Sequence, residues 1–261
     1  MGFWESILLG LVEGLTEFLP VSSTFHLILA SRLMGTAETD FTKLFEVFIQ
    51  SGAILAVVIL YWKRIQRDRT LVKKTLVAFI PTAILGVLAY RTIKEVFFES
   101  YAWMIAIFLL VGLLFVIFES LVKRGLVRPR KPLSELTYGS AVIIGLAQCL
   151  AFLPGGSRAG AVMLAMMLLG HRRDDSAAFS FLLAIPTIFS AAAYDLYKTR
   201  HVLLASGPQA WTLVAGFISA FAVAYFVVKW FIHYLQKHTL NVFGLYRLAA
   251  GCLLLLLLLL V

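Results

Sequence analysis

The sequence predicts an all-α polytopic membrane protein with six spanning helices and two re-entrant helical hairpins arranged as inverted-topology repeats. Three observations carry this prediction. The 261 residues are 61% hydrophobic and 14% charged, with a mean hydropathy of +0.92, whereas a soluble domain is about 45–50% apolar and about 25% charged. Most apolar residues form runs that are long enough to span a bilayer. Two further runs are interrupted near their middle, and the two interruptions resemble each other.

Composition and charge exclude several other classes of protein. Two cysteines are too few for a secreted disulfide scaffold, and the apolar content excludes a disordered chain and a soluble nucleotide-binding enzyme. A net charge of +9 would suit a nucleic-acid binder, but the basic residues lie in short segments between apolar runs, as in cytoplasmic loops of membrane proteins. We therefore expect membrane lipids around the protein and no nucleic acid as a partner.

Six apolar runs approach the ~20 residues that a helix needs to cross the hydrocarbon core. In chain order they are residues 41–62, 76–90, 103–122, 176–196, 211–230 and 242–261. The second run is short and could begin near Val72.

The basic residues between the runs predict the orientation in the membrane. Segments 63–74 and 123–131 are rich in Lys and Arg, whereas segment 35–40 carries two acids and segment 91–99 is balanced. Because positive charge favours the cytoplasmic side, we place the first two segments in the cytoplasm and both chain termini outside. The mildly basic segment 198–201 then lies on the side that the rule disfavours.

Residues 7–33 and 139–169 are also apolar, but each run is broken. The first break is Pro-Val-Ser-Ser-Thr at 20–24, and the second is Pro-Gly-Gly-Ser at 154–157. Each half is too short to cross the bilayer, and non-helical backbone at that depth is tolerated only beside protein or a water-filled cavity. Both runs therefore predict re-entrant hairpins.

The two breaks belong to an internal repeat. The Phe-Leu-Pro tripeptides that begin at residues 18 and 152 are 134 positions apart, and the serines that follow them keep that spacing. We divide the chain into repeats 1–125 and 132–261, each with one hairpin (6–34 and 136–170) and three spans, within one integrated membrane domain. An odd number of spans inverts the second copy. Inverted repeats with broken helices place a binding site near the bilayer midplane, with helix N-termini directed at an anion.

The first hairpin carries a pair of carboxylates. Glu13 and Glu17 are one helical turn apart, so that both side chains share a face. An ionised carboxylate costs roughly 2.5–3.5 kcal/mol at the centre of a lipid-facing helix, which favours a wet cavity with a shared cation or a retained proton. The alternative is that Glu13 lies near the interface and extends to water.

Hydroxyls and a histidine follow at the first break. Ser22, Ser23 and Thr24 stand where the second helix begins, a position at which serine often caps a helix, and Ser22 is the candidate for that role. His26 follows Ser23 by three residues on the same helical face, so that a nucleophile and its base could lie within hydrogen-bonding reach. The alternative is a histidine satisfied by core contacts.

The second break offers groups that recognise anions. Gly155 and Gly156 let backbone N–H groups approach an oxyanion, and Ser157 adds a hydroxyl. Arg158 supplies a planar guanidinium that suits phosphate oxygens, although pairing with either glutamate of the first hairpin would also explain it. Gln148 occupies the place of the first of those glutamates in the repeat and could give a neutral hydrogen bond.

Together these features predict an anion site for a phosphorylated molecule, and the carboxylate pair with an arginine suggests phosphoester or phosphoanhydride hydrolysis. The sequence resembles the bacitracin-resistance type of undecaprenyl-diphosphate phosphatase from end to end. The matching motifs are residues 13–24 (EGLTEFLPVSST) followed by His26, 45–47 (FEV) with Gln50, 154–158 (PGGSR) and 179–186 (FSFLLAIP).

The resemblance implies removal of the terminal phosphate from undecaprenyl diphosphate, a polyprenyl diphosphate lipid, which yields the monophosphate carrier for peptidoglycan synthesis and confers bacitracin resistance. It implies a multi-pass protein of the bacterial plasma (inner) membrane, with an active site that opens toward the periplasmic or extracellular side. It also implies a divalent cation, Mg²⁺ or Ca²⁺. A homodimer is a possible assembly.

Carried over residue by residue, the resemblance implies that Ser23 is the nucleophile and that His26 is its base or a proton shuttle. Glu13 and Glu17 would handle metal or protons, and Arg158 would clamp the phosphates. Further candidates for contact with the substrate phosphates are Ser22, Thr24, Gln148, Gly155, Gly156 and Ser157. Two mechanisms stay open: a phosphoseryl intermediate on Ser23, or attack by a metal-bound water with Ser23 only orienting the phosphate.

Three positions depart from the family pattern. Phe25 stands where the family usually has Gly, which could narrow the pocket, and Ala159 and Val162 replace a Ser and a Thr, so that two hydroxyl donors to phosphate are lost. Because Ser157, Arg158 and the glycines remain, we expect activity to be retained. Whether the three replacements change the rate or the substrate preference is left open by the sequence.

A transporter is the alternative function. Inverted repeats and broken helices also suit alternating access, so the same fold could flip a polyprenyl phosphate across the membrane. Ser23 and His26 together with the glutamate pair are not required for transport alone, and they favour the enzyme.

Overall fold

The computed structural model describes residues 1–37, 39–96, 101–201 and 210–260. Within these ranges the secondary structure is helical, apart from one isolated backbone bridge between Lys131 and His171. The α-helices are α1 (Phe3–Thr16), α2 (Ser23–Leu33), α3 (Asp40–Arg67), α4 (Arg69–Val96), α5 (Tyr101–Lys123), α6 (Tyr138–Gln148), α7 (Arg158–Leu168), α8 (Arg173–Lys198), α10 (Ala210–Lys237) and α11 (Asn241–Leu260). Two short 3-10 helices are η1 (Leu133–Glu135) and η2 (Cys149–Phe152).

Six of the described helices are long and apolar enough to cross a membrane: α3, α4, α5, α8, α10 and α11. They coincide with the six predicted runs, which confirms an all-helical protein that passes the membrane several times. Parts of the predicted segments 35–40, 91–99 and 242–261 lie outside the described residues.

The prediction of a loop at residues 63–74 is wrong, because nearly all of this segment is helical. Helix α3 continues to Arg67 and α4 begins at Arg69, so that Asp68 alone separates the two spans. Lys and Arg are good helix formers, which lets both helices extend through the basic segment. Asp68 accepts a hydrogen bond from the N–H of Leu71 at 2.8 Å, and this cap starts α4.

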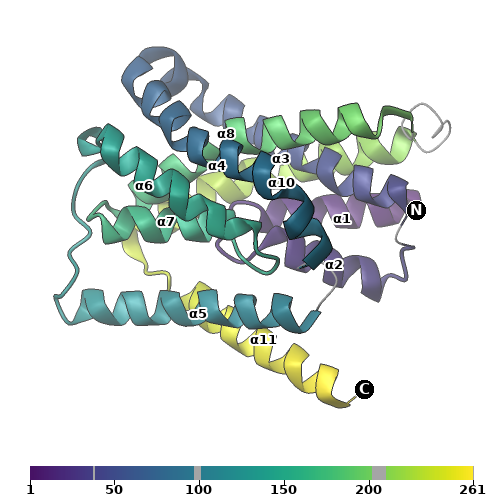
Figure 1. The fold of residues 1–261 in the computed structure, drawn as a ribbon. Coiled ribbons are helices and arrows are strands. Elements are labelled where there is room, and N and C mark those ends of the chain that lie inside the picture. Colours follow the sequence, from purple (N-terminus) through teal and green to yellow (C-terminus); the bar gives the residue numbers. More distant parts are fainter. Residues whose placement is uncertain (38, 97–100, 202–209, 261) are drawn as a thin grey trace.

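Helices α5 and α11 lie side by side along one edge of the molecule, and the other helices pack against one another beyond them (Figure 1). In the larger group α1 packs on α10, α6 packs on α4, and α3 contacts both α8 and α10. Several of the helix contacts need glycine; for example, a Cβ at Gly14 would lie 2.5 Å from the Ala220 carbonyl oxygen and one at Gly145 would lie 2.0 Å from that of Ala78. Helices α1 and α6 thus approach their neighbours backbone to backbone.

The two broken runs form two pairs of short helices, α1 with α2 and α6 with α7. These helices have 14, 11, 11 and 11 residues and are about 16–21 Å long at 1.5 Å per residue. A hydrocarbon core of about 30 Å exceeds each of them. Both breaks therefore lie where a helix ends before it could cross the membrane.

The largest hydrophobic cluster packs against the first break. Phe18, which directly follows Glu17, is fully buried and meets Phe181 edge to face with ring centroids 5.3 Å apart. The same cluster includes Phe115 and Phe231 from α5 and α10. Burial of Phe18 among three spans fixes the turn that follows α1.

Candidate functional site

The first break contains a strained residue. Helix α1 ends before Glu17, whose N–H donates to the carbonyl of Glu13. The chain then turns to Ser22, whose φ of 70° is the only positive value for a non-glycine residue in the described part of the chain. Such backbone costs about 1–3 kcal/mol and is found mostly at functional sites. It redirects the chain so that α2 begins at Ser23.

Ser22 stands at the N-terminal cap of α2, but its side chain makes no capping hydrogen bond to that helix. The predicted capping role of this side chain is therefore wrong. Its carbonyl oxygen accepts instead from the N–H of His26 at 3.3 Å and from Nδ1 of the same histidine at 2.7 Å. Thr24 follows in the first turn of α2 and is half-buried.

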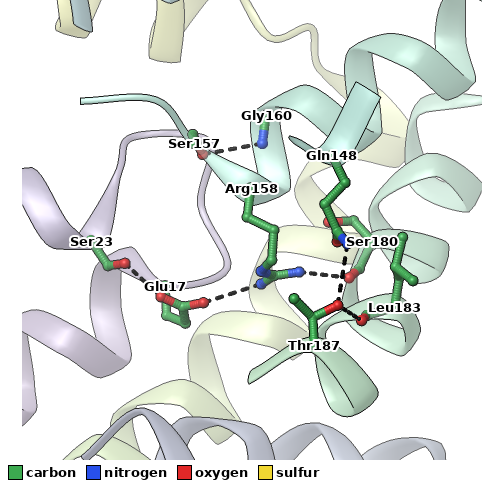
Figure 2. Close-up of polar contacts among 9 residues, drawn as sticks. All are labelled: Glu17, Ser23, Gln148, Ser157, Arg158, Gly160, Ser180, Leu183 and Thr187. Atoms are coloured by element: carbon green, nitrogen blue, oxygen red, sulfur yellow. Dashed lines mark hydrogen bonds and ion pairs between the residues drawn. The ribbon is translucent and has the colours of Figure 1, made fainter. Parts of the chain in front are cut away.

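Glu17 connects the two breaks. Its Oε2 accepts a hydrogen bond from the Ser23 hydroxyl at 2.5 Å, and its Oε1 pairs with Nη2 of Arg158 at 3.2 Å. Figure 2 shows the carboxylate between these two side chains. Arg158 also donates from Nη1 to the carbonyl oxygen of Ser180 at 2.9 Å. The structure thus brings a hydroxyl of the first break and a guanidinium of the second break to one carboxylate.

This polar chain is buried. The Arg158 and Glu17 side chains are 11% and 8% exposed, and Ser23 is 9% exposed. The alternative for Arg158, pairing with Glu13 or Glu17, is therefore present in the fold as the pair with Glu17. Its Nε is also buried and has no hydrogen-bond partner among the described residues. This N–H can donate to an oxygen of a bound ligand.

Glu13 lies one turn before Glu17 and is completely buried. The alternative in which this side chain extends to water is therefore wrong. Neither carboxylate oxygen accepts from a donor within the described residues, but the Glu17 carboxyl is close enough to share a proton with it, and the charges of Glu46 and Arg158 also act on it. A buried carboxylate beside a second carboxyl requires a cation, a proton or bound water.

His26 does not bond to the Ser23 hydroxyl in this structure. Its Nδ1 donates to the Ser22 carbonyl, and its Nε2 lies 2.6 Å from the hydroxyl of Tyr246 on α11. With the proton on Nδ1, the neutral imidazole accepts at Nε2, so the Tyr246 hydroxyl is the donor. Both ring nitrogens have partners other than Ser23, whose hydroxyl donates to Glu17.

Several polar groups of the second break are already hydrogen-bonded within the protein. Gly155 has a φ of 83°, and its carbonyl accepts from Nη2 of Arg247 at 2.6 Å. The N–H of Gly156, expected to face an oxyanion, donates to the carbonyl three residues earlier. Ser157 caps α7, because its hydroxyl oxygen accepts from the N–H of Gly160 at 3.1 Å. The N-terminus of α7 is the remaining anion-attracting feature of this loop.

Gln148 lies on the other side of Arg158 with several hydroxyls (Figure 2). Its Nε2 donates to Thr82 at 2.8 Å and to Thr187 at 3.2 Å. Its Oε1 and the Ser180 hydroxyl are buried and lack hydrogen-bond partners within the described residues. Gln148 and Glu13 thus each have a buried side-chain oxygen that accepts from no donor in the described part of the chain.

The three departures from the family pattern are buried. Phe25 stacks on Phe108 of α5, with ring centroids 4.0 Å apart, and meets His26 edge to face. Ala159 and Val162 are 1% and 0% exposed in α7. The contacts of Glu17 with the serine and the arginine form in the presence of all three residues.

Sequence reasoning missed several polar residues that line or adjoin the site. All lie in apolar spans, where a polar side chain is a signal in itself, and two of them also lie within the family motifs 45–47 and 179–186, to which no role was assigned. They are Glu46, Thr82, Ser180, Thr187 and Tyr246.

The fold and the site define a multi-pass membrane protein in which a buried carboxylate joins a hydroxyl of one broken run to an arginine of the other. Residues 6–253 match the family model of the bacitracin resistance protein BacA, and the chain belongs to this family. The resemblance inferred from the motifs is thereby confirmed.

Curated relatives of this chain carry the name undecaprenyl-diphosphatase. The protein of Campylobacter fetus subsp. fetus is 44% identical over 254 residues, which cover 96% of this chain and 97% of that protein. The protein of Aquifex aeolicus is 44% identical over 254 residues, with 95% of each chain covered. The protein of Thermus thermophilus is 43% identical over 252 residues, with 94% of each covered.

Proposed function

We propose that this chain is an integral membrane phosphatase that hydrolyses undecaprenyl diphosphate to undecaprenyl phosphate and inorganic phosphate. The observation that carries the proposal is the buried Glu17, which joins the Ser23 hydroxyl to the Arg158 guanidinium. Relatives that are 43–44% identical over nearly the whole chain carry the name of this activity. The family description adds bacitracin resistance as the physiological outcome.

The arrangement suits phosphoryl transfer. Arg158 can bind the terminal phosphate and stabilise the charge that develops on its oxygens. As the Ser23 oxygen attacks phosphorus, its proton passes to Glu17, and the bond to the bridging oxygen breaks to release undecaprenyl phosphate. Water then attacks the phosphorus of the phosphoserine while the bond to the Ser23 oxygen breaks. The serine oxygen regains its proton from Glu17, and the freed carboxylate takes the proton that the water loses and passes it to solvent. Direct attack by water, with Ser23 only orienting the phosphate, is the alternative mechanism.

We assign His26 the role of a proton shuttle rather than the base of Ser23. Its two nitrogens contact the Ser22 carbonyl and the Tyr246 hydroxyl, which favours a path for protons toward α11. Glu17 is the group that accepts the hydrogen bond of the serine and is therefore the better candidate for its base.

Glu13 and Glu17 are the residues that would hold a divalent cation, Mg²⁺ or Ca²⁺. The two buried oxygens of Glu13, which accept from no donor in the described residues, fit this role. No group of three or more His, Cys, Asp or Glu side chains in the described ranges could hold an ion by itself. Mg²⁺ is commonly held by one or two carboxylates plus substrate phosphates and water, and it would neutralise charge on the phosphate oxygens.

We also propose that the short-helix pairs are re-entrant hairpins of two inverted repeats, 1–125 and 132–261. The packing of the two halves supports this proposal, because the first short helix of each half packs on a span of the other half. Helix α1 of the first half packs on α10 of the second, and α6 of the second packs on α4 of the first. The corresponding helices α3 and α8 contact each other, as do α5 and α11. A two-fold relation between the halves produces this pattern. With the basic segments in the cytoplasm, the site is proposed to open toward the periplasmic side.

Phosphate release from undecaprenyl diphosphate by the purified protein in detergent tests the function. We expect release with Mg²⁺ or Ca²⁺ and loss of release with EDTA. Arg158→Ala should lower kcat by about 10²–10³-fold, as removal of one oxyanion-stabilising group does. Arg128→Ala, an exposed arginine outside the spans, is the matched control and should behave as wild type. No release under any metal condition would refute the phosphatase and favour transport of the lipid.

The role of Ser23 is tested separately. With terminally labelled substrate, rapid acid quenching should trap labelled phosphate on Ser23 if this residue is the nucleophile. Full turnover by Ser23→Ala would eliminate the phosphoseryl mechanism and leave direct attack by water.

A further inference from the structure

Arg247 on α11 is the largest of the fully buried side chains and is 0% exposed. Its guanidinium donates to three backbone carbonyls. Nε donates to Phe108 at 3.0 Å, Nη1 to Pro20 at 3.2 Å and Nη2 to Gly155 at 2.6 Å. Pro20 belongs to the first break and Gly155 to the second, so that one side chain is bonded to both turns.

Each of the two bonded carbonyls lies shortly before a site residue in the sequence. Pro20 stands three residues before Ser23, and Gly155 stands three residues before Arg158. A displacement of either carbonyl is transmitted over a short stretch of backbone to the side chain that follows. The guanidinium of Arg247 therefore sets the separation of the two turns directly.

The positive charge of Arg247 is stabilised by three backbone carbonyls and an aromatic ring, not by a carboxylate. No ion pair of this arginine with a carboxylate is found in the part of the chain that the structure describes, and its guanidinium lies 4.3 Å from the ring centroid of Phe108. A buried cation without a counter-ion is expensive, so its position needs a reason. Lysine cannot replace it, because a single ammonium cannot reach three carbonyls in fixed directions.

A glycine on α5 allows α11 to approach closely at the position of Arg247. A Cβ at Gly112 would lie 2.8 Å from the Cβ of Arg247, so glycine is needed where α11 crosses α5. From α11 the arginine contacts α5 at Phe108 and also reaches the two breaks at Pro20 and Gly155.

We infer that Arg247 is a positioning residue for the phosphatase reaction, which holds the two turns so that Arg158 meets Glu17 and Ser23. The inference rests on the proposed function. Arg247 acts through backbone carbonyls and not on the substrate. Its removal should therefore lower kcat by misaligning the site while KM changes little. A misplacement of about 1 Å can cost about 10²-fold in rate.

The experiment compares Arg247→Lys and Arg247→Ala with Arg173→Lys. Arg173 is half-buried and forms an ion pair with the fully buried Glu119, which also accepts from the N–H of Leu240 at 2.9 Å. This pair joins α8 to α5 and, through Glu119, to the residue before α11, whereas Arg247 contacts α5 about two turns further along α11. Arg173→Lys thus weakens the hold on Glu119, and through it the docking of α5 beside α11, without touching either turn.

We expect both Arg247 variants to lose about 10²-fold in kcat per folded enzyme. Arg173→Lys should lower the melting temperature but keep the wild-type kcat. Millimolar guanidinium chloride should restore kcat in Arg247→Ala by filling the vacated space, and it should not act on Arg247→Lys. If Arg247→Ala does not fold, the kcat and KM of Arg247→Lys carry the test.

Wild-type kcat in a folded Arg247 variant would overturn the inference. So would an equal loss of kcat in Arg173→Lys, because docking of α5 and α11 would then suffice as the cause, or a failure of guanidinium to rescue folded Arg247→Ala. Inactivity of the wild-type protein toward undecaprenyl diphosphate in the same preparation would refute the phosphatase itself. The two failures are therefore distinguishable.

Discussion

Replacement of Glu17 by glutamine removes the charge at the centre of the site while it keeps the shape of the side chain. The carboxylate accepts from Ser23 at 2.5 Å and from Arg158 at 3.2 Å. In Glu17→Gln the amide has one accepting oxygen, and its NH₂ group must face the other donor. The amide also cannot take a proton from the serine. A general base contributes about 10²–10⁴-fold, so we expect kcat to fall by that factor, or about 2.7–5.4 kcal/mol at 1.36 kcal/mol per tenfold.

The same substitution leaves the buried Arg158 without its counter-charge. Breaking such a pair costs about 3–5 kcal/mol, and the melting temperature in detergent should fall accordingly. Phosphate release must therefore be expressed per mole of folded protein, which separates the loss of the base from the loss of stability. Glu135→Gln is the matched control, because this residue is exposed in η1, and it should change neither quantity. Wild-type turnover by folded Glu17→Gln would refute the assignment of Glu17 as the base of Ser23.

Three further substitutions test separate parts of the structure. Glu13→Gln should raise the Mg²⁺ concentration for half-maximal activity in a titration of EDTA-treated enzyme, and an unchanged titration would argue against a cation at this carboxylate. Tyr246→Phe removes the hydroxyl 2.6 Å from Nε2 of His26; since a hydrogen bond contributes about 0.5–1.5 kcal/mol, kcat should fall about 2–10-fold, and an unaltered pH–rate profile would exclude a shared proton path. Gly145→Ala places a Cβ 2.0 Å from a backbone carbonyl of α4, so thermal unfolding should show a loss of about 1–3 kcal/mol. Gly139→Ala, where the nearest atom is 4.0 Å away, should unfold as wild type does.

The spans could be predicted because hydropathy and the length of a membrane-crossing helix are local properties. Their ends could not, and the junction at Asp68 shows why. Positive charge predicts the side of the membrane on which a segment lies, but it does not end a helix, since Lys and Arg are favourable in one. The helices therefore run through the basic segment and stop only where Asp68 caps the next one.

The members of the site could be predicted better than their pairing. Glu17, Ser23 and Arg158 stand out as polar residues beside interruptions of apolar runs, and the structure brings these three together. The partner of Ser23 was predicted from helical spacing, which favours His26. That rule holds within one helix, whereas Glu17 precedes the turn and approaches the serine because the chain folds back at Ser22.

Arg247 illustrates a contact that no local pattern reveals, because its partners are backbone carbonyls, which any residue type can supply. A physical argument nevertheless points to such a residue. Each helix that breaks inside a membrane leaves carbonyls without an internal donor, and no water of the hydrocarbon core can satisfy them. A guanidinium carries five N–H donors, so one arginine can serve the carbonyls of two breaks at once. An arginine within an apolar span of a protein with two broken helices is therefore best interpreted as a donor to the breaks, before an acidic partner is sought.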